Sequence, residues 1–253
     1  MRAVLTYHSI DDSGSPISMP AAALERQLRW LASGRVKVVS LGDLIRLPAD
    51  ADAAAVTFDD GFENFSTRAA PLLIALALPA TVFVVTGRVG STNDWAGHPT
   101  SGIPTLPLLG WPTIERLFKS GIAIGAHSRT HRDLTRLDPA ELDDEIFGSA
   151  DDCRSKLGVA PDAFAYPFGR VNREAAERVS AGFACGCTTE LRALRGADAA
   201  AMLPRLDMYY FQRSERLEAW GTPTFDRHLA VRRQARRARA LLDGGLWKGK
   251  RTG

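Results

Sequence analysis

The sequence predicts an α/β fold in which parallel strands carry helices on their outer side, either as a barrel or as a doubly wound sheet. Short β-branched or apolar segments alternate with helical segments along most of the chain, and this alternation is typical of parallel sheets. The 253 residues can bury a large core, and barrels of this length often form one domain. Hydrophobic residues make up 45% and charged residues 24%, as in globular proteins.

The predicted strands and helices follow one another in a regular order. The strands cover residues 3–7, 36–39, 54–58, 80–85, 122–126, 163–166, 183–188 and 203–207. The helices cover residues 20–32, 41–47, 65–78, 112–120, 139–157 and 172–180. Leu24, Leu28 and Leu31 give the first helix one apolar face. Pro112 suits the first turn of its helix, and Asn172 suits the N-cap of the last one.

Charge divides the chain into two parts. The net charge is +3, but the segment 226–253 holds nine Lys or Arg residues against Asp226 and Asp243. The segment therefore carries +7, and residues 1–225 carry −4. We expect a catalytic barrel over residues 1–225 and a basic C-terminal tail over residues 226–253, in which residues 227–242 are able to form a helix.

The tail predicts contact with an anionic surface. A basic helix followed by Trp247, Lys248 and Lys250 is typical of segments that lie on anionic membranes. A solvated terminal helix is the alternative. Nucleic-acid binding is disfavoured because the rest of the chain is negatively charged.

The expected location is cytoplasmic, at the inner membrane surface. The opening MRAVLTYHSI lacks the apolar stretch of a secretory signal, and no apolar run approaches the ~20 residues that span a bilayer. Cys153, Cys185 and Cys187 form no even disulfide framework. We interpret them as buried, reduced residues, which agrees with a cytoplasmic location.

Candidate site residues lie at or just after the ends of several predicted strands. They are His8, Asp59, Asp60, His127, Phe168, Gly169 and the stretch 205–207. In barrels of parallel strands the active site lies at the C-terminal ends of the strands. We therefore expect these separate segments to meet at one rim of the barrel.

Asp59 and Asp60 end an apolar strand and are followed by Gly61, which permits a sharp turn. Two adjacent carboxylates in a partly buried place repel each other unless a cation shares the site. The alternative is a structural one, in which Asp60 or Asn64 caps the following helix. The doublet alone does not separate catalysis from capping.

His127 and His131 favour a metal site. Two imidazoles four residues apart face one cation where the turn between them is helical. Two histidines and one carboxylate leave coordination positions open for water and substrate, which is the pattern of a catalytic zinc site. The chain has only five histidines, and these two follow a predicted strand.

Three segments of the sequence resemble the signature motifs of the polysaccharide deacetylases, carbohydrate esterase family four. They are Thr57-Phe-Asp-Asp-Gly61, His127-Ser-Arg-Thr-His131 and Ala165-Tyr-Pro-Phe-Gly169. Their order and separation match as well, so the resemblance covers about Arg2 to Asp207. Tyr7-His8-Ser9-Ile10 and Pro204-Arg-Leu-Asp207 resemble the branch that acts on bacterial surface-polysaccharide precursors or related sugars.

The resemblance implies a distorted (β/α) barrel of about seven parallel strands and removal of an N-acetyl group from an amino sugar in a glycan. Asp60, His127 and His131 would bind a divalent metal, with Zn²⁺ expected and Ni²⁺, Co²⁺ or Mn²⁺ as alternatives. Asp59 would be the general base. The remaining alternatives are a metal-dependent hydrolase of another C–N bond, such as a cyclic amide, and a catalytically silent sugar-binding protein.

The sequence departs from the family pattern at two roles. Many members carry an Arg where this chain has Ala165, so we expect Arg205 to supply that charge from another strand. Many members also have a Leu-x-His motif that provides a general acid, and no histidine lies between His131 and His228. His8, His127, His131 or a returning proton on Asp59 are the candidates for protonating the leaving amine.

The substrate is expected to contact aromatic and backbone groups at the rim. Trp95 and Trp111 belong to the long loop after the fourth strand, where aromatic faces suit a sugar ring or merely anchor the loop. The turn Tyr166, Pro167, Phe168 and Gly169 offers a backbone N–H for an oxyanion. His98 and His228 are interpreted as surface residues.

Overall fold

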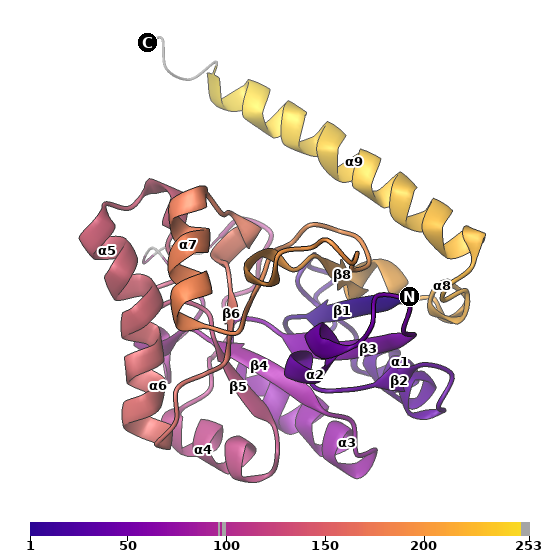
Figure 1. Ribbon diagram of the computed structural model, residues 1–253, viewed down its shortest axis with the longest axis horizontal. Helices are drawn as coiled ribbons and strands as arrows, with labels where there is room; N and C mark the ends of the chain where they lie inside the picture. Colours follow the sequence, from indigo (N-terminus) through magenta and orange to yellow (C-terminus); the bar gives the residue numbers. More distant parts are fainter. Residues whose placement is uncertain (96, 98–99, 249–253) are drawn as a thin grey trace. The chain divides into compact units, whose positions relative to one another are not determined.

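The computed structural model describes residues 1–95, 97 and 100–248, and it divides the chain into two compact units (Figure 1). The first unit is Met1–Gln212 and the second is Arg213–Gly253. The division falls after Gln212, whereas the expected boundary lay after residue 225. The short helix α8 (Ser214–Glu218) accordingly belongs to the second unit.

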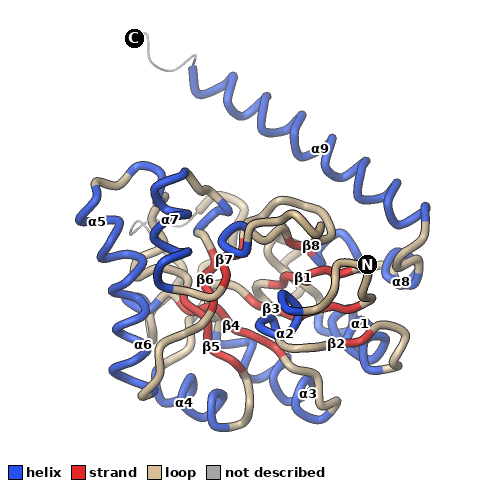
Figure 2. The backbone as a smooth tube through the Cα atoms, in the orientation of Figure 1, coloured by secondary structure: helices blue, strands red, loops and turns tan. Residues whose placement is uncertain are grey.

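The first unit is a nearly closed barrel of parallel strands, as predicted (Figures 1 and 2). The strands are β1 (Arg2–Tyr7), β2 (Lys37–Val38), β3 (Ala53–Phe58), β4 (Ala80–Val84), β5 (Ala123–Ala126), β6 (Ala163–Ala165), β7 (Cys185–Cys187) and β8 (Arg205–Asp207). Seven of them run in the order β7-β6-β5-β4-β3-β1-β8, and β2 pairs with β3. A parallel bridge from Cys187 to Leu203, just before β8, brings the two ends of the sheet together.

Helices cover the outside of this barrel (Figure 2). They are α1 (Ala21–Ala32), α2 (Leu41–Arg46), α3 (Ala70–Ala75), α4 (Trp111–Lys119), α5 (Pro139–Asp143), α6 (Ser149–Leu157) and α7 (Arg173–Gly182). Two predicted helices contain π-helical turns, η1 (Phe65–Ala69) before α3 and η4 (Asp144–Gly148) between α5 and α6. Each π turn inserts one residue per turn into the helix, and such turns often occur at functional sites.

The strands form where their composition allows complete burial. Every residue of β1 and of β3 is buried, so neither strand shows the alternation of apolar and polar residues that a sheet with one solvated face would have. Gly125 in β5 lies against Phe83, where a Cβ would come within 2.3 Å of the ring. The interior of the barrel is therefore closely packed, and polar side chains collect at the ends of the strands.

The three cysteines are buried, and the basic tail is helical. Cys153, Cys185 and Cys187 are free and buried, as interpreted from their neighbours. The tail forms the helix α9 (Pro223–Lys248), which is longer than the expected 227–242. Among the described residues, no helix is both long and apolar enough to cross a membrane.

Candidate metal centre and active site

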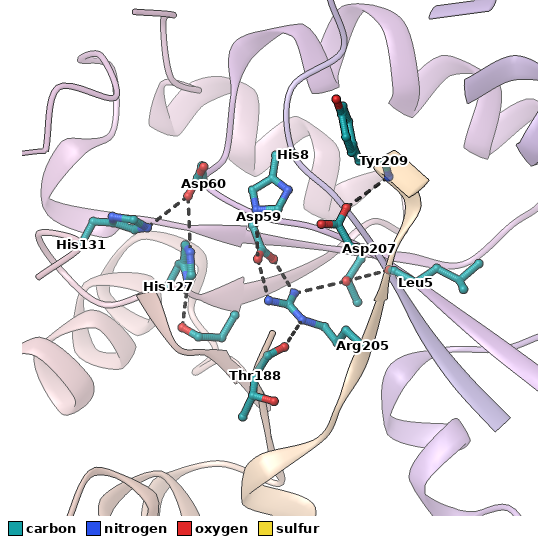
Figure 3. Close-up of polar contacts among 12 residues, drawn as sticks. Leu5, His8, Asp59, Asp60, His127, His131, Thr188, Arg205, Asp207 and Tyr209 are labelled. Atoms are coloured by element: carbon teal, nitrogen blue, oxygen red, sulfur yellow. Dashed lines mark hydrogen bonds and ion pairs between the residues drawn. The ribbon is translucent and has the colours of Figure 1, made fainter. Parts of the chain in front are cut away.

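The carboxyl ends of β1, β3 and β5 bring His8, Asp59, Asp60 and His127 to one place, and β8 adds Arg205 (Figure 3). Asp59 and Asp60 follow β3, His127 follows β5, and His8 follows β1. Arg205 lies in β8 and reaches the same point from the other side of β1. The expected meeting of separate segments at one rim is what the barrel topology produces, since parallel strands end at the same edge.

Asp60, His127 and His131 form a buried triad. The Nε2 atoms of His127 and His131 each lie 3.3 Å from Asp60 Oδ1. The three ligand atoms lie within 4.8 Å of one another, and no more than 6% of each residue is exposed. Two imidazoles and a carboxylate at these distances match the donor set of a catalytic zinc site.

The hydrogen bonds of the imidazoles show that a cation fits this triad. His127 Nδ1 lies 2.7 Å from the Ala165 carbonyl oxygen, which can only accept, so the neutral ring carries its proton on Nδ1. His127 Nε2 therefore presents a lone pair toward the Asp60 carboxylate. Two acceptors at 3.3 Å repel each other, and a divalent cation between them removes this repulsion.

The charged groups of the triad influence one another strongly. Burial would raise the pKa of Asp60, but the neighbouring imidazoles of His127 and His131 outweigh burial and hold the pKa well below its usual range. Burial also lowers the pKa of His131 below its ordinary value, against the opposing effect of Asp60. An ionised carboxylate beside a neutral imidazole is the state that metal binding needs.

Asp59 is paired with Arg205 inside the barrel. Arg205 Nη1 and Nη2 donate to the two carboxylate oxygens at 2.6 and 2.7 Å, and Nε donates to the Thr188 carbonyl oxygen at 2.8 Å. Arg205 is only 1% exposed. Burial alone would raise the pKa of Asp59, but the charge and hydrogen bonds of Arg205, together with His127 and His8, more than offset it, so the pKa lies below the usual value. Arg205 thus occupies the position expected of the arginine that Ala165 cannot provide.

His8 lies beside Asp59, in the cavity that the metal triad also lines (Figure 3). Its Nε2 is 3.8 Å from Asp59 Oδ2, and its side chain is 22% exposed. It is therefore the more accessible of the histidines near Asp59. A proton can reach it from the cavity without passing through the barrel interior.

The backbone of the site adopts strained conformations at several positions. Asp60, Ser128, His131 and Phe168 have φ values between 59° and 70°, the left-handed region that non-glycine residues avoid. The two histidines are not joined by a helical turn, because residues 127–133 form a loop without helix. The loop places the two imidazoles against Asp60 by left-handed turns at Ser128 and His131 instead.

A cavity of 270 Å³ opens above the triad. It is lined by His8, Ile17, Asp59, Asp60, Asn93, Trp95, Thr100, Ile103, His127, His131, Tyr166, Phe168 and Thr189. Trp95 stacks on His131 with ring centroids 4.2 Å apart and an interplanar angle of 29°. Phe168 meets the same imidazole edge-on at 4.6 Å.

The structure does not bring every expected substrate residue into the cavity. Trp111 begins α4 and is not part of the cavity lining, nor are Pro167 and Gly169. Pro167 and Gly169 shape the turn instead, since a Cβ at Gly169 would meet the Thr189 hydroxyl at 2.0 Å. His228 is 7% exposed and accepts a hydrogen bond from Arg216, so its assignment to the surface is wrong. His98 lies outside the described residues.

The sequence did not predict some of the residues that line the cavity. Ile17, Ile103 and Thr189 belong to loops without a motif, and only the fold brings them to the cavity. Asn93 carried a signal, because it stands beside Trp95 in a loop rich in Gly and Pro. Its side chain donates to the Pro104 carbonyl oxygen and accepts from the Leu106 N–H, so it holds the loop together.

The comparisons with known proteins agree on one family. A family model described as polysaccharide deacetylase matches residues 46–185, more than half of the chain. YxkH of Bacillus subtilis (strain 168), whose name assigns it to the same family, is 26% identical over 195 residues, covering 74% of this chain and 64% of YxkH. The poly-beta-1,6-N-acetyl-D-glucosamine N-deacetylase of Escherichia coli (strain K12) is 31% identical over 98 residues, 36% of this chain and 14% of that protein. This chain therefore spans less than two thirds of either relative.

Two solved structures share the fold. IcaB from Ammonifex degensii superposes with a TM-score of 0.71 at 22% identity, over 87% of this chain and 96% of IcaB. The deacetylase PplD of Streptococcus pyogenes, solved with acetate, superposes with a TM-score of 0.69 at 22% identity, over 81% of this chain and 91% of PplD. Together with the match of the family model and the three motifs, these likenesses establish that the chain belongs to the polysaccharide deacetylase family.

Proposed function

We propose that this protein is a metal-dependent hydrolase that removes the N-acetyl group from an amino sugar in a glycan or glycan precursor. The observation that carries the proposal is the pairing of two sites in one cavity. Asp60, His127 and His131 form a buried donor set, and a second carboxylate, Asp59, lies beside it and accepts two hydrogen bonds from Arg205.

The chemistry requires an activated water and a polarised amide carbonyl. A divalent cation held by Asp60, His127 and His131 would supply both, as a Lewis acid that also lowers the pKa of water to about 7. Zn²⁺ suits a donor set of two nitrogens and one oxygen, and Ni²⁺, Co²⁺ and Mn²⁺ remain to be compared. Asp59 accepts the proton of the attacking water, and Arg205 keeps that carboxylate ionised and oriented.

The tetrahedral oxyanion needs a hydrogen-bond donor from the protein. Pro167 has no N–H, and the Gly169 N–H donates to the Tyr166 carbonyl oxygen at 2.8 Å. The Phe168 N–H is therefore the donor that this turn can offer. Phe168 also lines the cavity, so its backbone lies close to where the acetyl group would bind.

His8 is the group that we assign to protonation of the leaving amine. It lines the cavity, and its Nε2 lies 3.8 Å from the carboxylate that takes up the proton of water. A His8→Gln variant should keep metal binding and lose turnover. Unchanged turnover would transfer the role to Asp59, which would then return its own proton.

The substrate class rests on the cavity and on the relatives. Trp95 and Phe168 present aromatic surface beside polar groups, which suits a sugar ring. The E. coli relative is named for a poly-N-acetylglucosamine substrate, and we extend the class of N-acetylated amino sugars to this chain.

The test is acetate release from a panel of N-acetyl sugars that are free, nucleotide-linked, lipid-linked or polymeric, with metal-stripped protein and Asp59→Asn as controls. No acetate from any of them while metal is bound would refute the proposal, and release from a cyclic amide instead would favour the other C–N bond hydrolase.

The basic helix α9 is proposed to hold the enzyme at an anionic membrane surface, on the cytoplasmic side. Its described part carries arginines at short intervals, and Val231 is 62% exposed among them. Its cations include Arg227, Arg232, Arg233, Arg236 and Arg237. Sedimentation with phosphatidylglycerol vesicles should retain the full chain, and a variant with glutamine at Arg232, Arg233, Arg236 and Arg237 should be released. Equal sedimentation of both proteins would contradict this role.

A further inference from the structure

The loop that carries both histidine ligands is strained and must be held from outside. Ser128 and His131 have φ values of 62° and 61°, each of which costs about 1 kcal/mol or more for a residue with a Cβ. Within the loop, the His131 N–H donates to the Ser128 hydroxyl at 3.0 Å. One internal hydrogen bond contributes about 1 kcal/mol, which does not offset two left-handed residues.

A buried carboxylate from the neighbouring helix meets this loop. Glu145 lies in the π-helical turn η4 and is only 3% exposed. Its Oε2 accepts the backbone N–H groups of Arg129 and Thr130 at 2.9 and 2.8 Å, and its Oε1 accepts the Thr130 hydroxyl. Both oxygens of this carboxylate are therefore used on the two residues that separate Ser128 from His131. No step of the proposed reaction uses Glu145.

The opposite side of the loop is fixed by the backbone after β4. The Thr86 N–H donates to the Ser128 carbonyl oxygen at 3.2 Å, and the Gly87 N–H donates to the Arg129 carbonyl oxygen at 2.8 Å. A Cβ at Gly87 would come within 2.7 Å of that oxygen, so the approach needs glycine. The backbone of the loop is thus held between a backbone edge and the Glu145 carboxylate. The Arg129 side chain adds ion pairs to Asp144 and Asp152 at 2.6 and 3.1 Å.

The two imidazoles differ in how their rings are held. His127 is oriented by the contact of its Nδ1 with the Ala165 carbonyl oxygen. His131 Nδ1 is buried and has no hydrogen-bond partner among the residues that the structure describes. A metal-binding histidine normally donates from its other nitrogen to a fixed acceptor. The position of His131 therefore depends on its backbone, and on the rings of Trp95 and Phe168 that contact it.

We infer that Glu145 is a positioning residue of the metal centre: it holds the backbone of residues 129–130 so that His131 faces Asp60. Glu145 touches neither the metal donors nor the cavity, so it acts through the loop alone. This role rests on the proposed metal site. It predicts that the loss of Glu145 weakens metal binding more than it weakens the fold.

Two variants separate positioning from general stability. Glu145→Ala removes all three hydrogen bonds, whereas Glu145→Gln keeps an amide oxygen for the two N–H groups and an amide N–H for the Thr130 hydroxyl. Asp151→Ala is the matched control, because Asp151 lies in the adjoining α6, and its ion pair with Arg154 is exposed. Thr130→Val removes a single hydrogen bond and serves if Glu145→Ala does not fold.

The measurements are the dissociation constant for Zn²⁺, by chelator competition, and the melting temperatures of metal-free and metal-loaded protein. We expect a loss of affinity of about 10- to 100-fold in Glu145→Ala, the range seen when groups that orient metal ligands are removed. Glu145→Gln should recover most of this loss, Thr130→Val should lie between, and Asp151→Ala should match the wild type.

The outcomes separate a failure of the proposed metal site from a failure of the role assigned to Glu145. If the wild type binds no divalent metal, the proposed function fails. If the wild type binds metal and a folded Glu145→Ala binds it within about two-fold as tightly, with only a lower melting temperature, then Glu145 is merely structural and the inference is overturned. Wild-type affinity in Thr130→Val would overturn it in the same way if Glu145→Ala is unfolded.

Discussion

The buried pair of Asp59 and Arg205 allows a quantitative test of the proposed base. The change is Arg205→Met, which keeps much of the side-chain volume but removes the charge and the four hydrogen bonds that the guanidinium donates to Asp59, Thr188 and Thr57. A cation at this distance lowers the pKa of a carboxyl group by about 1 to 3 units. Its removal should leave Asp59 with burial as the dominant influence, and burial raises the pKa.

The expected result is a displaced pH profile. The acid limb of kcat/KM for acetate release should move upward by about 1 to 3 pH units in Arg205→Met, because Asp59 must be ionised to accept a proton. Zn²⁺ content should be unchanged, since Arg205 contacts none of the three donors. Arg205→Lys is the control that retains a positive charge, and its acid limb should shift less.

Stability should change in a defined pH range. The folded pKa of Asp59 lies below its unfolded value of about 3.9, so the pair stabilises the fold above that pH and the contribution is lost as the pH falls through the folded pKa. Removal of one partner of a buried pair costs about 3 to 5 kcal/mol. The loss in urea unfolding should therefore be large at pH 7 and smaller near pH 3. Full activity with an unmoved acid limb in Arg205→Met would refute the assignment of Asp59 and Arg205.

Three further results are expected. Gly169→Ala should destabilise the fold by about 1 to 3 kcal/mol in urea unfolding, because φ is +66° and the new Cβ would meet the Thr189 hydroxyl at 2.0 Å. Gly42→Ala in α2 is the control and should be nearly neutral. Equal stabilities of the two variants would contradict the packing argument. Burial raises the pKa of the Cys153 and Cys187 thiols to about 12, so both should resist a disulfide reagent at pH 8 until the protein is denatured, and rapid labelling of the folded protein would show that they are not buried. Dialysis against a strong chelator should lower the melting temperature and abolish acetate release, both of which Zn²⁺ restores; no change in either would argue against a bound metal.

The fold and the main residues of the site could be predicted from the sequence, for physical reasons. Buried parallel strands leave continuous apolar runs such as β3, and the polar residues that follow them stand out. Asp59, Asp60 and His127 could be located in this way, because residues that directly follow parallel strands lie at the same edge of the sheet. Arg205 could be suggested as the partner of Asp59 because Ala165 stands where many family members carry an arginine, and the place of β8 next to β1 is what lets it reach Asp59.

What could not be predicted depends on contacts between distant segments. The left-handed loop that carries the two histidines takes its shape in part from Glu145, whose carboxylate accepts hydrogen bonds from two N–H groups of the loop. Glu145 comes from a segment with several acidic residues, and nothing in the sequence distinguishes it from the others. Trp95 and Trp111 had equal signals, and only the path of the loop sends the first into the cavity and the second to the start of α4. The π-helical turn that carries Glu145 has no signature in the sequence either.

The central claim is that one divalent metal at Asp60, His127 and His131 makes this protein an N-deacetylase. The most direct measurement is acetate release from an N-acetylglucosamine oligomer as Zn²⁺ is titrated into metal-stripped protein. The rate should rise in proportion to the bound metal, level off at one equivalent per chain, and stay at zero in His131→Ala. A rate that does not depend on the metal, or a His131→Ala variant that is activated like the wild type, would contradict the account.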